Sequence, residues 1–131
     1  MNMAWIDLLD RAEFLRKLYP SAPSLREVRV FEVGLRNDGP VVNIRFNLNE
    51  FPAAPPTKWI QACANTVQVR LMCVGVLGLE VQGWPSNLIA DIDIERSEKT
   101  GLILTASAEG FRFKGVFEFI SVDAVSAYLK A

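Results

Sequence analysis

The chain has 131 residues, and half of them are hydrophobic. Its formal net charge is −1, whereas nucleic-acid-binding domains typically carry a strong positive charge. It contains no histidine, so the most frequent general base and transition-metal ligand is missing. A chain of this length normally forms one domain with a hydrophobic core that needs no disulfide or metal, so we expect a single domain over residues 1–131.

The first twenty residues are predicted to form one amphipathic helix (residues 1–20) that Pro20 ends. The large apolar side chains of this segment recur at spacings of three and four residues, which places them on one helical face. They are Trp5, Leu8, Leu9, Ala12, Leu15, Leu18 and Tyr19. Acidic residues interrupt the apolar run of this segment, whereas a signal peptide has an uninterrupted apolar core. No stretch of the chain reaches the roughly 18 consecutive apolar residues of a membrane span. We therefore expect a cytoplasmic protein.

From residue 26 the apolar period changes to two, which predicts an antiparallel sheet over residues 26–120. Strands at 27–36 and 40–48 flank a turn and should form a hairpin. The first of them changes its apolar parity near Val30 and Phe31, which indicates either a β-bulge or burial on both faces. Further strands are expected at 66–74, 76–82, 88–96, 101–108 and 111–120. The tail, 121–131, fits a strand or a short helix equally well.

Residues 49–65 interrupt this alternation. Their three prolines exclude a central strand, so the segment is predicted to be a Pro-rich crossover loop with one helical turn near 58–62. The pair Pro55–Pro56 could bind an aromatic groove of a partner, but ordinary stiffening of a loop is the favoured interpretation.

Short strands in series, joined by tight turns without intervening helices, are typical of a meander. The predicted fold class is therefore α+β. It consists of a curled antiparallel β-sheet meander of six or seven strands with an N-terminal helix packed on it.

The two cysteines, Cys63 and Cys73, lie ten residues apart and have neither the spacing nor the histidines of a metal site. We expect two small buried hydrophobic residues in preference to a redox pair, because free cysteine is among the most buried residue types. Their pattern predicts no disulfide.

Three acidic residues, Asp91, Asp93 and Glu95, form the most prominent cluster of charges. Alternate positions on a strand place these carboxylates on one face, about 7 Å apart. A straight strand spreads them too widely to surround one hard cation. A solvated face paired with Arg112 or Lys114 on a neighbouring strand and a partner-binding face both stay open, and the three residues are our only candidate site residues.

No segment carries a catalytic motif. The serines have no histidine to activate them, and no glycine-rich phosphate loop precedes a helix. The phenylalanines of 111–120 lie on the face opposite the neighbouring basic residues and are expected in the core. We predict a protein that is not an enzyme, without catalytic, cofactor-binding or metal-binding residues and without a nucleic-acid or membrane partner.

Several sequence blocks occur in an order that resembles the immunity protein 50 family of bacterial polymorphic-toxin systems. They are W-x-D-L-L and E-F-L-R-K-L-Y-P (Trp5–Leu9, Glu13–Pro20), P-S-L-R-E-V (Pro23–Val28), D-G-P (Asp38–Pro40), F-P-x-x-P-P-x-K-W (Phe51–Trp59), N-T-V-Q-V (Asn65–Val69) and G-W (Gly83–Trp84). The blocks cover about the first two thirds of the chain. None of them is a catalytic signature.

The resemblance implies an immunity protein that binds and neutralises a cognate toxin by non-catalytic occlusion, and it assigns no contact residues. Trp5, Trp59 and Trp84 lie in these blocks, and packing is favoured over an interface role for all three. Two alternatives stay open, a carrier of a small apolar ligand and an uncharacterised interaction module. A homodimer formed through an exposed sheet edge also stays open.

Overall fold

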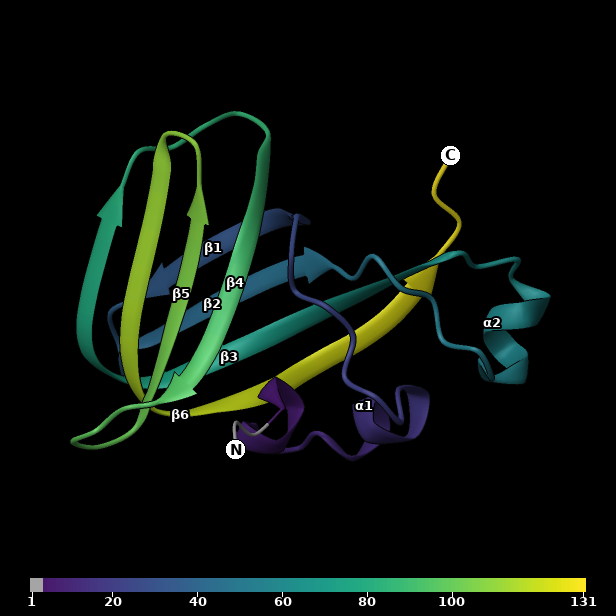
Figure 1. Cartoon of the computed structure of the whole chain (residues 1–131), viewed down its shortest axis with the longest axis horizontal. Coiled ribbons are helices and arrows are strands. Elements are labelled where there is room, and N and C mark those ends of the chain that lie inside the picture. Colours follow the sequence, from purple (N-terminus) through teal and green to yellow (C-terminus); the bar gives the residue numbers. More distant parts are fainter. Residues whose placement is uncertain (1–3) are drawn as a thin grey trace.

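The computed structural model describes residues 4–131 and contains six antiparallel strands in one sheet that closes on itself (Figure 1). The strands are β1 (Val28–Arg36), β2 (Val41–Asn47), β3 (Thr66–Gln82), β4 (Leu88–Arg96), β5 (Leu102–Ala108) and β6 (Phe111–Tyr128). The helical segments are the 3-10 turn η1 (Trp5–Leu8) and the short helices α1 (Glu13–Leu18) and α2 (Thr57–Gln61). The predicted α+β class, with an antiparallel sheet and helical segments at the N-terminus, is confirmed.

The strand order is β1-β2-β3-β6-β5-β4, so two three-stranded meanders are joined along the long strands β3 and β6. A short contact between 28–30 of β1 and 88–90 of β4 closes the sheet. The sequence predicted separate strands at 66–74 and 76–82, which was wrong, because β3 is continuous. Gly75 adopts a φ of +71° and a register shift follows between Val76 and Gly78, so β3 bends while it stays paired with β6.

Other local predictions are confirmed. β1 and β2 form the expected hairpin, and its register shifts between Val30 and Glu32, so of the two alternatives left open for this strand the bulge is the one observed. The helical turn in the crossover is α2. The tail is a strand as far as Tyr128, because the start of β3 provides a partner for it: Thr66 pairs with Tyr128.

The single helix predicted over 1–20 was wrong; its first three residues lie outside the described part of the chain. Two short helical segments stand in its place, separated by residues 9–12, in which Arg11 has a φ of +58°. The backbone of Asp10 explains the break, because it pairs with β6. Its N–H donates to the Ile120 carbonyl at 2.9 Å, and its own carbonyl accepts from the Val122 N–H at 2.9 Å. These hydrogen bonds with the sheet replace those that a continuous helix would make.

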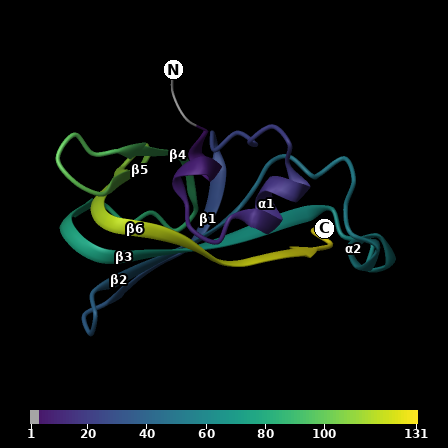
Figure 2. The same cartoon turned by 90° about the horizontal axis from the view of Figure 1, so that it is seen from below.

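The N-terminal segment nevertheless buries the apolar face that was predicted. Figure 2 shows η1 and α1 on the same side of the β3–β6 pair. Leu9, Leu15 and Leu18 join the core, together with inward side chains from every strand. No helix in the described chain is long and apolar enough to cross a membrane.

The two cysteines are both free, and their environments differ. Cys73 is buried as expected, and this burial raises the pKa of its thiol to about 12, which keeps it protonated and unreactive. The burial predicted for Cys63 was wrong, because it follows α2 in the crossover loop and is exposed.

Candidate partner-binding surface

Asp91, Asp93 and Glu95, the β4 carboxylates, lie on the outer face of β4. The residues between them point into the core, where Ile92 is 1 % exposed and Ile94 is 9 % exposed. The alternation that predicted a shared face for the three carboxylates therefore describes the strand correctly.

The partner of the β4 carboxylates was predicted wrongly. Arg26, in the segment that leads into β1, forms an ion pair with Asp93, and its Nη1 lies 3.9 Å from Asp91 Oδ2. The backbone N–H of Glu27 also donates to Asp91 Oδ1 at 2.8 Å. Arg112 and Lys114 lie on β6, which β5 separates from β4.

Arg26 neutralises part of this face and leaves part of it charged. The hydrogen bond to Asp93 raises the pKa of Arg26, as expected for a guanidinium beside a carboxylate. Because the Arg26 and Asp93 side chains are 51 % and 59 % exposed, the pair contributes at most about 1 kcal/mol to stability. Arg26 is shared between Asp91 and Asp93, and Glu95 makes no ion pair among residues 4–131, so the cluster keeps a net negative charge.

An exposed apolar patch adjoins this charged face. Ile89 continues the outer row of β4 and lies opposite Arg29 of β1. Ile89 is 50 % exposed, Phe31 is 41 % exposed and Trp84 is 67 % exposed. We call these four residues (Arg29, Phe31, Trp84 and Ile89) the Trp84 patch. Trp, Phe and Arg together are the composition of protein-binding surfaces, whereas soluble monomers usually cover such side chains.

A hollow of about 230 Å³ lies within the patch, between β1 and the loop that leads from β3 to β4. Residues 29–33 of β1 line one wall, and Trp84, Pro85, Ser86 and Leu88 line the other. The edge of β1 beside this hollow is unpaired in the described chain, because β4 reaches only as far as Val30. A partner side chain can therefore enter between an apolar wall and free backbone groups.

Charged neighbours hold Phe31 in place. The guanidinium carbons of Arg29 and Arg45 lie 5.0 Å and 5.5 Å from the centre of its ring. Glu32 lies 4.0 Å from Arg45 and 3.7 Å from Arg70. A ring in contact with two cations loses little freedom on binding, which suits an interface anchor.

Trp84 is held by a backbone constraint and one ring contact. Gly83 has a φ of +81° and lies against the Gly110 carbonyl, where a Cβ atom would overlap it. The Trp84 ring meets the buried Phe111 ring edge-on, with centroids 6.0 Å apart. The packing predicted for Trp84 was therefore wrong, because most of its side chain is exposed. One signal was present in the sequence: a Trp between Gly and Pro lies in a turn, outside any alternating strand.

The other two tryptophans pack as expected. Trp5 donates from Nε1 to the Pro23 carbonyl at 2.8 Å and is half-buried against the core. Trp59 packs between Phe14 and Phe51, at centroid distances of 5.8 Å and 6.3 Å. These contacts fasten η1 to the segment before β1 and the crossover loop to α1.

The Trp84 patch and the β4 carboxylates form a surface that can bind a protein partner. Their side chains do not converge on one point where a substrate atom could react. Within residues 4–131, no group of three or more Cys, Asp or Glu is placed to hold a metal ion. One comparison with known proteins gives a match: the sequence model of a family described as Immunity protein 50 matches residues 11–128. No curated protein and no solved structure matches the chain.

Proposed function

The chain belongs to the Immunity protein 50 family, and we propose that it protects the cell that makes it by binding a cognate toxin and occluding the surface through which the toxin acts. In this proposal the protein acts in the cytoplasm as part of a polymorphic-toxin system and catalyses no reaction. The observation that carries it is the family match over 11–128, together with an exposed surface suited to a protein partner.

We place the toxin contact on the Trp84 patch and the adjoining β4 carboxylates. The outer row of β4 runs without a break from Ile89 through Asp91 and Asp93 to Glu95. Apolar anchors beside a row of carboxylates favour a toxin surface that has an apolar protrusion flanked by Lys or Arg. The interior of the closed sheet is filled by side chains, and the hollow in the patch is open at the surface, so neither favours the alternative of a small-ligand carrier.

The direct test is co-expression of this chain with the toxin encoded beside its gene. We expect cells that produce both proteins to grow and cells that produce the toxin alone to die, because a bound toxin cannot reach its target. The two purified proteins should also form a complex that survives gel filtration. Equal killing with and without this chain would contradict the proposal.

The substitution Glu95→Lys tests the charged part of the surface. It leaves the Arg26 pairs with Asp91 and Asp93 intact, so the fold should not change. If the toxin surface is basic, we expect association to slow by about tenfold at low salt and its salt dependence to flatten, because carboxylates steer a basic partner. Stopped-flow association rates over a salt series measure both effects.

Glu13→Lys is the matched control, because it makes the same charge change at an exposed residue of α1, outside β4 and the Trp84 patch. We expect its association rate to stay close to wild type. If Glu95→Lys and Glu13→Lys behave alike, the β4 carboxylates do not belong to the contact.

A further inference from the structure

Three arginines gather on the outer face of the sheet, next to Phe31. Arg45 of β2 and Arg70 of β3 lie directly opposite each other, and both point outward because their neighbours along each strand are buried. Arg29 of β1 contacts the same face of the molecule, since its guanidinium and that of Arg45 both lie against the Phe31 ring. We call Arg29, Arg45 and Arg70 the arginine cluster.

The arginine cluster is only partly neutralised. Glu32 is shared by Arg45 and Arg70, at 4.0 Å and 3.7 Å. Asp123 adds a second carboxylate, 3.3 Å from Arg70. Arg29 forms no ion pair with any residue of the described chain. Three positive charges therefore share two negative ones, and the cation left over is the one that belongs to the Trp84 patch.

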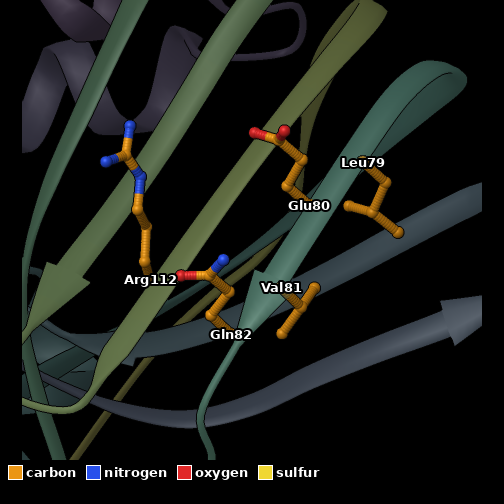
Figure 3. A pocket seen from close by; sticks show the side chains of 5 residues that line it. All are labelled: Leu79, Glu80, Val81, Gln82 and Arg112. Carbon is orange, nitrogen blue, oxygen red and sulfur yellow. The ribbon is translucent and has the colours of Figure 1, made fainter.

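This arrangement differs from the rest of the outer face. Like charges directly opposite each other destabilise a sheet, and where β3 pairs with β6 they do not occur, because Glu80 lies opposite Lys114. Figure 3 shows part of the next pair, in which the uncharged Gln82 lies opposite Arg112. In the arginine cluster, by contrast, two arginines face each other and the Glu32 Oε1 atom is buried without a hydrogen bond. Local costs of this kind are typical of functional sites.

The charge of the outer face changes sign along β1. Because Val28 pairs with Ala90 in an antiparallel ladder, the β4 carboxylates lie beside the N-terminal end of β1, where Arg26 is their one cation. The arginine cluster lies further along β1, because Glu32 pairs with Arg45. The Trp84 patch adjoins both groups of charges. The candidate surface is therefore negative at one end and positive at the other.

We propose that the arginine cluster binds acidic side chains of the toxin, so that the toxin presents Asp or Glu to this cluster and Lys or Arg to the β4 carboxylates. The inference rests on the proposed function and deepens it by naming the chemistry of the partner surface. A toxin carboxylate that binds Arg29 neutralises the one cation of the cluster that has no ion pair, through a charge-assisted hydrogen bond. Opposite charges at the two ends of the contact also fix the orientation in which the toxin docks.

The substitution Arg29→Glu separates this partner from a uniformly basic one. We expect association to slow by about tenfold at low salt, because the new carboxylate repels the acidic residues of the toxin. A uniformly basic toxin surface would instead associate faster, because the substitution adds negative charge to the contact. Lys17→Glu is the matched control, because it makes the same charge change at an exposed residue of α1, and its rate should stay close to wild type. Stopped-flow mixing with the purified toxin measures the rates.

Zero-length cross-linking identifies the partner residue directly. A carbodiimide joins an amine to a carboxylate that touches it and leaves a guanidinium unreacted, so Arg29→Lys introduces a reactive group and keeps the charge. We expect mass spectrometry of the complex to show position 29 linked to an Asp or Glu of the toxin, and the native Lys17 not linked. A complex that gives no link from position 29, or that forms as fast or faster with Arg29→Glu, would overturn this proposal and leave the proposed function standing. Failure of the wild-type proteins to form a complex would overturn both.

Discussion

Trp84→Ala should weaken toxin binding by about 30- to 1,000-fold, equivalent to about 2–4 kcal/mol of binding free energy. The expectation follows from the position of Trp84, which is 67 % exposed and lines the hollow of the Trp84 patch. An exposed Trp beside Phe and Arg is the commonest kind of residue to dominate a protein interface. Titration calorimetry with the purified toxin measures the loss.

The same substitution should affect folding much less. Trp84 makes one ring contact with the core, to Phe111 at 6.0 Å, and the loss of such a pair costs about 0.5–1.5 kcal/mol. Urea denaturation of the free protein separates this effect from the loss of affinity.

Leu129→Ala is the matched control, because Leu129 is 63 % exposed and lies near the C-terminus, outside the patch. We expect its toxin affinity to equal that of wild type. If Trp84→Ala also binds like wild type, the patch is not the contact.

Alternation in the sequence predicted the strands well because most of them bury one face. In β2, for example, Ile44 and Phe46 are fully buried while Arg45 between them is half-exposed. The bulge near Phe31 was also predictable, because a change of parity inside a strand needs an extra residue. These features depend on neighbouring residues along the chain and are therefore visible in one sequence.

The departures have tertiary causes. Apolar spacing cannot show that the backbone of Asp10 pairs with β6, which is what breaks the predicted helix. Nor could it show that Arg26 reaches Asp93 across 67 residues of chain. The sequence predicted only part of the candidate site, because the rest of it depends on tertiary contacts. The carboxylates follow from strand parity, whereas the Trp84 patch needs β1, β4 and a loop to meet.

Gly83→Ala is expected to be the most destabilising change in this loop, with a loss of about 4 kcal/mol or more in the free energy of unfolding. Two costs add at this position. The φ of +81° is a left-handed conformation that costs a residue with a Cβ about 1–2 kcal/mol. The added methyl group would also overlap the carbonyl oxygen of Gly110, a backbone atom that cannot move without disturbing the β5–β6 turn.

Gly110→Ala separates the two costs. Gly110 has a similar φ, +76°, but a Cβ built there meets no atom within 4 Å. We therefore expect Gly110→Ala to lose only the 1–2 kcal/mol or so of the backbone conformation in a urea denaturation series. Gly83→Ala should in addition weaken toxin binding, because Gly83 sets the path of the chain into Trp84. Equal losses of stability in the two variants would show that the close approach of Gly83 to Gly110 does not fix this loop.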